Sequence, residues 1–454
     1  MTLPDGLLLA AYGDDFTGSA AVMEVMAFAG LHAALFLDLP TPQQLARFPK
    51  LRALIVAGTA RSHGPEWMEA HLPRLFEGLS RTGAPLVHYK VCSTLDSAPH
   101  IGSIGRAVEL ALSVFAAPAV PVLLAAPAIR RYQCFGQLFA AAPGGVFRLD
   151  RHPVMACHPV TPMDEAEVAR HLACQTTLPI GLIDLETMQD PQRTRTRLAE
   201  LGAAGNRIIC LDTLTDDDLA LCGELLWDRR GPGAFCVGSQ GVEYALVEHW
   251  RRSGLLAPAP HPPGIGRARG MIAVSGSVSS VTAAQIDWAL AQGFQGLALE
   301  AGDLVGDDER SRAAEAAAMA ACRAALSEGR DPLVHTARGP NDPAVARLAE
   351  ARARAGIDAE VANTRIGAAL GRILARVVQD TGLRRAVISG GDTSGHATRQ
   401  LGIYALTALA PTIPGAAILR GWSEEPAFDG LELALKGGQM GGADYFGRIR
   451  DGGG

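Results

Sequence analysis

Aromatic residues are scarce in this chain of 454 residues, at 5% of its composition, and basic residues do not outnumber acidic ones. Lys and Arg total 41 against 47 Asp and Glu, so the formal net charge is −6. The sequence also lacks a run of Lys or Arg with interleaved aromatic residues. Nucleic-acid binding depends on a basic surface and on stacking rings, so no nucleic-acid partner is expected.

The common nucleotide-binding and catalytic motifs are missing as well. No GxxxxGK[ST] loop occurs, which excludes a Walker-type ATP site in its usual form. No GxGxxG follows the first apolar run, which weakens the hypothesis of a Rossmann dinucleotide site. HExxH, an EF-hand loop and a GxSxG elbow are also absent. Any nucleotide must therefore be held by a different arrangement.

Long uninterrupted apolar runs and paired cysteines are absent too. The longest apolar stretch, residues 110–129, is broken by Pro118, Pro121 and Pro127, so no membrane span is expected. The N-terminus has no basic segment ahead of its apolar run, which argues against a signal peptide. The eight cysteines are scattered without a CxxC pair, which is typical of reduced thiols in a cytoplasmic protein.

The chain does contain enough apolar material for two cores. Hydrophobic residues make up 48% of the sequence, and 454 residues exceed what one ordinary core accommodates. Residues 251–270 are rich in Pro, Gly and Arg and show no periodicity. They are the expected linker between a first domain, residues 1–250, and a second domain, residues 271–454.

Strand and helix patterns alternate along both domains. Residues 7–12 form a continuous apolar run, as expected of a strand buried on both faces. Further strands of the first domain are predicted at 32–37, 51–57, 85–91, 120–125, 180–185, 207–211 and 235–237, and helices at 19–30, 43–48, 66–79, 101–115, 164–175 and 216–227. In the second domain strands are predicted at 271–274, 296–299, 333–336, 386–388 and 433–436, and helices at 282–292, 309–327, 363–381 and 396–401. These repeats predict a two-domain α/β protein whose first domain is a doubly wound parallel sheet.

Polar residues follow several strands of the first domain, where ligands bind in open parallel sheets. They are Asp14, Asp15, Thr17, Arg61, Lys90, Ser93, Thr94 and Asp96. Cations that neutralise a carboxylate, beside carboxylates that accept hydroxyl protons, suit a polyhydroxylated anion. For any one of these residues, helix capping is an equally good explanation: Asp14 or Asp15 would cap one helix, and Asp96 with Ser97 would cap another.

Gly- and Ser-rich turns follow strands of the second domain at residues 275–280, 389–395 and 437–442. A strand that feeds such a turn into a helix directs several backbone N–H groups toward one point, which suits an anion. Three phosphate-competent turns in one domain predict a nucleotide. A zinc site at His152, Cys157 and His158 is not favoured, because these residues lack a second close ligand pair.

Six motifs in order resemble the four-carbon acid sugar kinases. GDDFTGS at 13–19, KVCSTLDS at 90–97 and HPVTPM at 158–163 are similar to the family's ADDFTGA, K-x-CST-x-DS and HPLTPM. SGSVS at 275–279, followed by Thr282 and Gln285, resembles SGSCS-x-x-T-x-x-Q. SGGDTSG at 389–395 and LKGGQMG at 435–441 resemble SGGETSG and LKSGNFG. The departures are Val278 for Cys, Asp392 for Glu, and Gly437, Gln439 and Met440 for Ser, Asn and Phe.

The resemblance implies an acid-sugar-binding first domain, a nucleotide-binding second domain and ATP-dependent phosphorylation of a hydroxyl on a small sugar acid. Candidate acids of about four carbons are 3-oxo-tetronate, threonate and erythronate, and 3-oxo-isoapionate is a branched alternative. Residues 129–151 match the family less well, which leaves the acid open. An NAD(P)-dependent oxidoreductase and a non-catalytic sugar-acid-binding protein are the alternatives of other kinds.

Roles follow from the same resemblance. Asp14 or Asp15 is expected to accept the hydroxyl proton, with Arg61 and Lys90 on the carboxylate, and Thr17, Ser93, Thr94 and Asp96 also contacting the acid. ATP is expected at Ser275, Ser277, Gly390, Gly391, Asp392, Thr393, Ser394, Gly438 and Gly441. Mg²⁺ is expected to bridge the phosphates with support from Asp392. A homodimer is plausible for such an enzyme.

Overall fold

The computed structural model describes residues 2–260, 262–306 and 308–454, and all of their side chains except that of Asp392. The chain divides after Pro260 into two compact units. No helix in these ranges is both long and apolar enough to cross a membrane.

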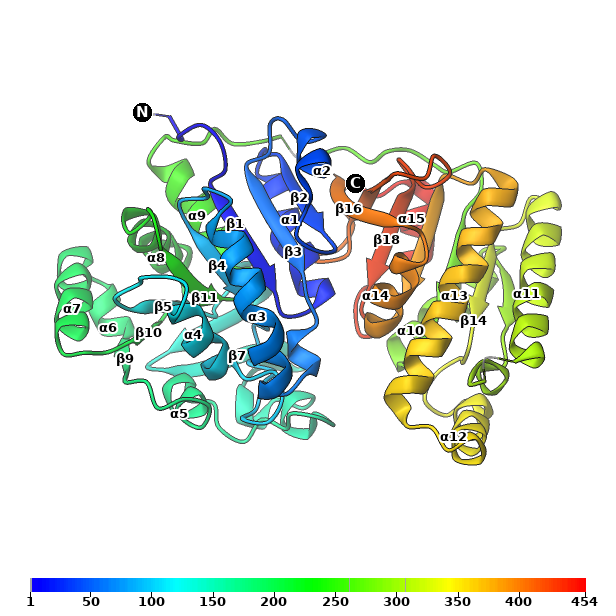
Figure 1. Ribbon diagram of the computed structural model, residues 1–454, viewed down its shortest axis with the longest axis horizontal. Helices are drawn as coiled ribbons and strands as arrows, with labels where there is room; N and C mark the ends of the chain where they lie inside the picture. Colours follow the sequence, from blue (N-terminus) through cyan, green and yellow to red (C-terminus); the bar gives the residue numbers. More distant parts are fainter. Residues whose placement is uncertain (1, 261, 307) are drawn as a thin grey trace. The chain divides into compact units, whose positions relative to one another are not determined.

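The N-terminal unit is built on a sheet with the strand order β2-β3-β1-β4-β11-β5-β10-β9, and all its described pairings are parallel (Figure 1). β1, whose sequence is LAAYG, is buried along its whole length, as its apolar run predicts. The strands are β1 (Leu9–Gly13), β2 (Ala33–Phe36), β3 (Ala53–Ala57), β4 (Val87–Lys90), β5 (Val120–Leu123), β9 (Ile180–Ile183), β10 (Ile208–Leu211) and β11 (Phe235–Gly238).

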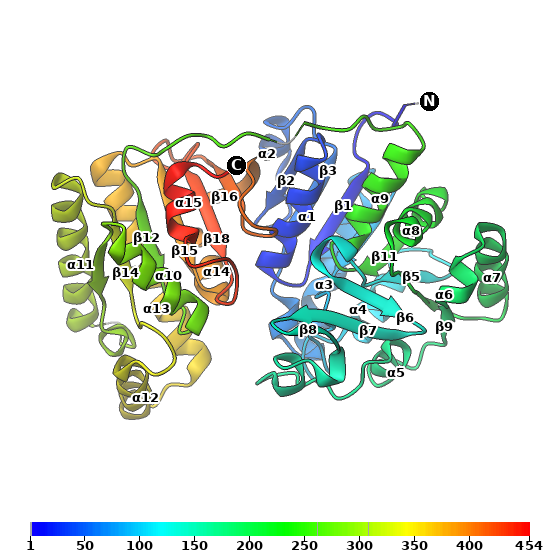
Figure 2. The ribbon, with the colours of Figure 1, turned by 180° about the vertical axis from the view of Figure 1, so that it is seen from behind.

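Helices cover both faces of this sheet, so the doubly wound prediction is confirmed. α1, α8 and α9 pack together on one face and α3 and α4 on the other (Figures 1 and 2). The helices are α1 (Phe16–Phe28), α2 (Pro42–Ala46), α3 (Pro65–Ser80), α4 (Ile104–Leu112), α5 (Val168–Ala173), α6 (Leu185–Met188), α7 (Pro191–Ala203), α8 (Asp216–Asp228) and α9 (Gly241–Arg252).

Three parts of this unit differ clearly from the sequence-based expectation. Residues 131–148, for which no element was predicted, form the antiparallel strands β6 (Arg131–Cys134), β7 (Gln137–Ala142) and β8 (Gly145–Arg148). Helix α7 was not predicted because its sequence is strongly polar, and it buries only a narrow stripe of Thr194, Leu198 and Leu201. The helix predicted over 164–175 is the shorter α5.

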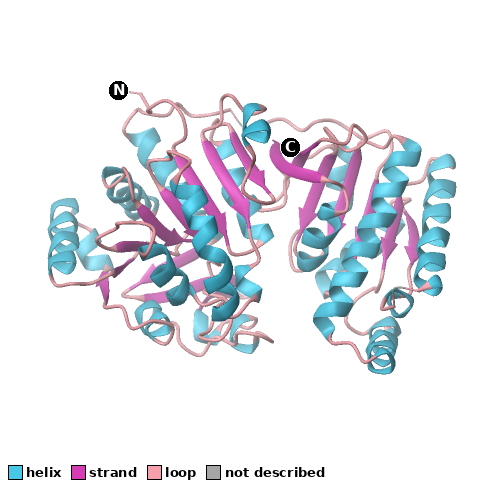
Figure 3. Ribbon diagram, viewed as in Figure 1, coloured by secondary structure: helices cyan, strands magenta, loops and turns pink. Residues whose placement is uncertain are grey.

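The C-terminal unit has the strand order β13-β14-β12-β15-β18-β17-β16, and its pairings are parallel except those of β17 with β16 and β18 (Figure 3). Helices α11, α13 and α14 cover one face, and α10 and α15 the other. The strands are β12 (Ile272–Ser275), β13 (Gln295–Ala298), β14 (Pro332–His335), β15 (Arg385–Ser389), β16 (Ile403–Ala410), β17 (Ile418–Ser423) and β18 (Glu432–Lys436). The helices are α10 (Ser280–Ala291), α11 (Glu309–Ser327), α12 (Pro343–Ala355), α13 (Ala359–Thr381), α14 (Gly391–Arg399) and α15 (Tyr445–Asp451).

One boundary in this unit matters for the site. The helix predicted over 396–401 is wrong at its start, because α14 begins at Gly391. Gly390, at φ +127°, adopts a backbone conformation that side chains disfavour, and this lets the chain leave β15 and turn directly into the helix. Residues 391–394 therefore form the first turn of α14 instead of a free loop.

The core of the N-terminal unit contains a cluster of rings that join strands to helices. Phe115 and Phe235 stack with centroids 4.9 Å apart, and the fully buried Phe76 of α3 meets both edge-on at 6.0 and 5.7 Å. We expect Phe76→Ala to lower the free energy of unfolding of this unit by about 3–5 kcal/mol, because it leaves a ring-sized cavity. Chemical denaturation measures the loss.

Phe135 provides the control, since its side chain is 63% exposed. Phe135→Ala should change the free energy of unfolding by less than about 0.5 kcal/mol. If both variants unfolded at the same denaturant concentration, the burial of Phe76 in the core would be contradicted.

Candidate active site

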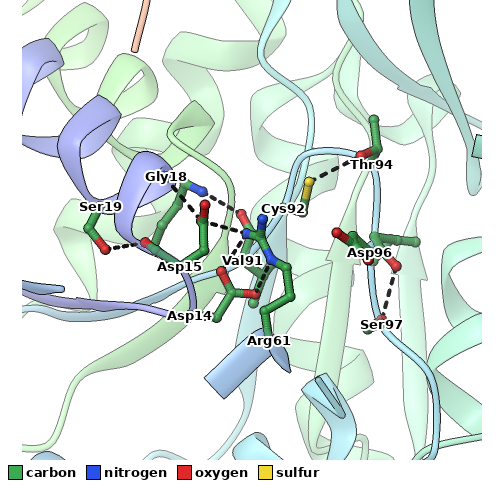
Figure 4. Close-up of polar contacts among 12 residues, drawn as sticks. Asp14, Asp15, Gly18, Ser19, Arg61, Val91, Cys92, Thr94, Asp96 and Ser97 are labelled. Atoms are coloured by element: carbon green, nitrogen blue, oxygen red, sulfur yellow. Dashed lines mark hydrogen bonds and ion pairs between the residues drawn. The ribbon is translucent and has the colours of Figure 1, made fainter. Parts of the chain in front are cut away.

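The end of β1 carries two carboxylates that share one guanidinium (Figure 4). Arg61 donates to Asp14 through Nε (3.2 Å) and through a terminal nitrogen (2.5 Å), and the same terminal nitrogen lies 2.7 Å from Asp15 Oδ1. Arg61 comes from a short 3₁₀ turn after β3, the neighbour of β1. Adjacent parallel strands thus bring Arg61 close to Asp15 and Asp14, which lie 46 and 47 positions earlier in the sequence.

Asp15 has two functions in this arrangement. It is the N-cap of α1, where Oδ1 accepts the backbone N–H of Gly18 at 3.1 Å, so the capping alternative is confirmed for this residue. It also binds Arg61 and keeps 25% of its side chain exposed, against 2% for Asp14. Of the two carboxylates, only Asp15 is open to a ligand.

Burial and charge act differently on the three groups. Burial raises the pKa of Asp14, and the Arg61 charge opposes this shift without cancelling it. Burial also acts to raise the pKa of Asp15, but Arg61 and Lys90 outweigh it and the pKa is lowered. Burial acts to lower the pKa of Arg61, and the two carboxylates reverse this, so its pKa is raised well above its usual value. Arg61 and Asp15 are therefore charged at neutral pH.

Lys90 adds a second cation to this edge. It is the last residue of β4, in register with Gly13 of β1, and only 2% of it is exposed. Its Nζ donates to the Val91 carbonyl at 2.8 Å, and a Cβ placed on Gly18 would lie 2.4 Å from it. Glycine at position 18 is what lets this ammonium approach α1.

A second polar group follows β4. Asp96 accepts a hydrogen bond from Thr161, whose hydroxyl lies 2.9 Å from His158 Nδ1. Thr94 Oγ1 lies 3.1 Å from Cys92 Sγ. Sequence reasoning missed His158 and Thr161 as partners of Asp96, although both lie in the HPVTPM segment quoted above.

Ser97, Ser93 and Thr17 are the other residues considered at the strand ends of this unit. The capping role considered for Asp96 and Ser97 is wrong, because the N-cap of α4 is Ser103, whose hydroxyl accepts from Arg106 N. Ser93 and Thr17 are half-buried, the latter in the first turn of α1. The N-terminal site thus offers two cations, an accessible carboxylate and hydroxyls, a set that suits a small hydroxylated anion.

In the C-terminal unit, the three Gly- and Ser-rich turns meet around a cavity of about 270 Å³. Their close approach requires glycine. A Cβ on Gly276 would lie 2.4 Å from Thr393 Oγ1, and one on Gly390 would lie 2.8 Å from the same atom. A Cβ on Gly438 would lie 2.8 Å from Ser277 Oγ. Side chains at these positions would fill the space where the turns converge.

The polar face of α10 holds the last of these turns. Ser279 donates to the Gly438 carbonyl, Thr282 lies 3.1 Å from the same oxygen, and Gln285 Nε2 donates to Met440 O at 2.8 Å and Gly442 O at 3.0 Å. Residues three apart on a helix lie on one face. This explains why Ser279, Thr282 and Gln285 are spaced three residues apart, a pattern whose purpose the sequence alone did not reveal.

The other wall of the cavity is mainly apolar and was not anticipated. It is formed by Ala301, Thr336, Ala337, Ala344, Val345, Leu348, Asn363 and Ile366. Ala344, Val345 and Leu348 come from α12, which was not predicted, and Asn363 and Ile366 come from α13. Backbone N–H groups opposite an apolar wall suit a ligand with a charged end and a flat apolar end, such as a nucleotide.

The expected nucleotide residues divide into three groups. Ser277, Gly390, Gly391, Thr393 and Gly438 line the cavity. Ser275, Ser394 and Gly441 are not among the described residues that line it. In Ser394 both the hydroxyl (2.7 Å) and the backbone N–H (2.9 Å) bind the Gly390 carbonyl, which leaves no donor for a phosphate. The side chain of Asp392, the expected metal ligand, lies outside the described part of the structure, so its role stays a prediction.

Comparison with known proteins agrees with both halves of this description. Residues 9–246 match the family model of a sugar-binding N-terminal domain, and residues 272–446 match that of a nucleotide-binding C-terminal domain. The chain is 45% identical to the 3-oxo-isoapionate kinase of Paraburkholderia graminis, over 99% of this chain and 95% of that protein. It is 32% identical to the 3-oxo-tetronate kinase of Methylobacterium radiotolerans, over 98% and 99% of the two chains.

Among solved structures, a protein from Salmonella typhimurium described as a putative tRNA synthase shares the fold, with a TM-score of 0.78. It is 24% identical in sequence and covers 97% of this chain and 98% of its own. A Haemophilus influenzae protein is similar at a TM-score of 0.71, 22% identity and 96% coverage of this chain. Because both family models and whole-chain relatives match, this chain belongs to the four-carbon acid sugar kinase family and is a sugar-acid kinase that uses ATP.

Proposed function

We propose that this kinase phosphorylates a hydroxyl of a small 3-oxo sugar acid, with 3-oxo-isoapionate as the first candidate and 3-oxo-tetronate as the second. The observation that carries the first candidate is the 45% identity over 99% of the chain to a 3-oxo-isoapionate kinase. The second rests on relatives at 29% and 32% identity named 3-oxo-tetronate kinase.

On the acceptor side, Arg61 and Lys90 neutralise the substrate carboxylate, and Asp15 accepts the proton of the attacking hydroxyl. The partial exposure of Asp15 and the burial of Asp14 support Asp15, and not Asp14, as the proton acceptor. Asp14, bound to Arg61 through both oxygens, holds the guanidinium in place. Thr17, Ser93, Thr94 and Asp96 orient the hydroxyl groups of the acid.

On the donor side, the turns at Gly276–Ser277, Gly390–Thr393 and Gly437–Gly438 hold the phosphates of ATP, and the apolar wall holds the base. Glycine at the points of convergence supports this proposal. Bound Mg²⁺ would neutralise the β- and γ-phosphates, with Asp392 as a candidate ligand. The protein then contributes positioning and charge neutralisation, which is most of what phosphoryl transfer requires. The cytoplasmic location and the homodimer stay predictions.

Replacing Asp15 with Asn tests the base. Asn also caps helices, so α1 keeps its N-cap while the site loses a proton acceptor. We expect kcat to fall by about 10²–10⁴-fold. The affinity for ATP, measured by calorimetry without the acid, should not change.

Asp190→Asn is the matched control, because Asp190 caps the exposed start of α7 in the same way. It should leave kcat unchanged. Wild-type kcat in Asp15→Asn would rule out Asp15 as the base and leave Asp14 as the candidate.

The nucleotide turns are tested by a pair of glycine substitutions. Gly390→Ala places a methyl group against Thr393 at a positive φ, so we expect the affinity for ATP to fall by at least about tenfold. Gly395→Ala adds a methyl group to the same helix with no atom within 4 Å, and its affinity should equal that of the wild type. Equal affinities for both variants would place the phosphates elsewhere.

ADP release measured across a panel of acids tests the substrate. We expect the highest kcat/KM with 3-oxo-isoapionate, lower values with 3-oxo-tetronate, and none with either acid after EDTA treatment until Mg²⁺ is restored. A higher kcat/KM with 3-oxo-tetronate would reverse the order of the two candidates. ADP release that persists after full chelation would contradict the magnesium requirement.

A further inference from the structure

Lys436 is a buried cation that none of the roles above uses. It is one of three lysines in the chain, with Lys50 and Lys90, and it is the last residue of β18. Its side chain is fully buried. No ion pair joins it to any carboxylate among the side chains that the structure describes. A buried ammonium without a counter-charge costs free energy, so a compensating function is to be expected.

The contacts of Lys436 lead to the rim of the nucleotide cavity. Its Nζ lies 3.1 Å from both Thr282 Oγ1 and the Gly437 carbonyl. Thr282 Oγ1 in turn lies 3.0 Å from Ser277 Oγ and 3.1 Å from the Gly438 carbonyl. An ammonium can only donate, so Thr282 must accept from it and pass its own proton to one of these two oxygens. When Ser277 accepts that proton, its own hydroxyl, which lies a long 3.4 Å from Ser279 Oγ, can turn to donate into the cavity.

The cavity needs such a charge. Its described lining residues include neither Lys nor Arg, although the triphosphate that it is proposed to hold is strongly anionic. Three polar residues lie in register with Lys436 across the neighbouring strands, in the order His335, Ser275, Ser389. Each is at least nine-tenths buried, and within the described residues His335 Nδ1, Ser275 Oγ and Ser389 Oγ have no hydrogen-bond partner. Among the side chains that the structure describes, this edge of the sheet has unused hydrogen-bonding capacity and no carboxylate that pairs with the ammonium.

We propose that Lys436 is a positioning residue for ATP: acting through the Thr282 hydroxyl, its ammonium fixes Ser277 and Gly438 on the cavity rim and supplies the positive charge that the triphosphate requires. The proposal rests on the nucleotide site of the proposed function. It predicts that ATP and a proton bind to the protein together.

Several titratable or charged groups lie on the elements around Lys436. They are Tyr445, Arg448, Arg450 and Asp451 on α15, Asp287 on α10, Asp392, His396 and Arg399 on α14, Arg385 on β15, Arg420 on β17 and Glu432 on β18 itself. Asp287 and Arg385 form ion pairs with Arg338 and Glu432, and the Tyr445 ring centroid lies 5.9 Å from Nζ. Burial lowers the pKa of Lys436 to about 8.

The sign of the pH effect follows from this value. Without ATP, Lys436 loses its proton as the pH rises through about 8. Bound phosphates favour the ammonium and raise its pKa, so ATP binding above pH 8 takes up a proton. Affinity for ATP should therefore fall as the pH rises through this range. Phosphate groups, with a second pKa near 6, do not titrate there.

Calorimetry of Mg–ATP binding without the acid, at pH 7.0 and 8.5 in buffers of different ionisation enthalpy, tests the proposal. The wild type should take up a proton at about pH 8.5 and little at about pH 7. Lys436→Met should bind ATP roughly 10- to 100-fold more weakly at neutral pH, with no proton uptake. Thr282→Val, which breaks the relay and keeps the ammonium, should also weaken binding. Lys50→Met, at an exposed lysine, should behave as the wild type.

The outcomes separate this proposal from the one on which it rests. A wild type that binds no ATP contradicts the nucleotide site itself. A wild type that binds ATP without taking up a proton at pH 8.5 overturns the role of Lys436, whether or not the variants fold. Equal ATP affinity in folded Lys436→Met, compared with Lys50→Met, overturns it as well.

Discussion

The burial of charge at the carboxyl ends of parallel strands is the constraint on which both units depend. Lys90 ends β4 and Lys436 ends β18, and both are almost completely removed from water. A charge in such a place is tolerated only when other groups stabilise it. The two units meet this requirement in different ways, and the difference matches the ligand that each unit is built to bind.

In the N-terminal unit, charge is balanced by charge. Arg61 binds Asp14 and Asp15, and the field of Lys90 contributes to the lowered pKa of Asp15. Such a cluster is costly to disrupt, because removing Arg61 would leave both carboxylates without the cation that they share. A small acid bound there as proposed would meet preformed cations and acceptors, so its binding would require little reorganisation of the protein.

In the C-terminal unit, dipoles take the place of counter-ions. The Lys436 ammonium is held by the Thr282 hydroxyl and the Gly437 carbonyl, and the turns around the cavity present backbone groups. Neutral donors and acceptors cannot fully balance an ammonium in a medium of low dielectric. The unit therefore keeps an ammonium, unpaired among the described side chains, at the end of β18, next to the turns that are proposed to hold the phosphates of ATP.

The sequence by itself determined the α/β class, most strands, the long helix Glu309–Ser327 and the turns that surround the two sites, because apolar runs and glycine-rich turns are local signals. It did not determine the start of α14, the strands within residues 131–148, the apolar cavity wall, or the pairing of Thr161 with Asp96, 65 residues apart. Which aspartate is open to a ligand was also decided only by the fold, since exposure depends on neighbours from β3 and β4. Tertiary structure decides these features because they arise from contacts between segments that are distant in the sequence. A local pattern of residues does not indicate which distant segments will meet.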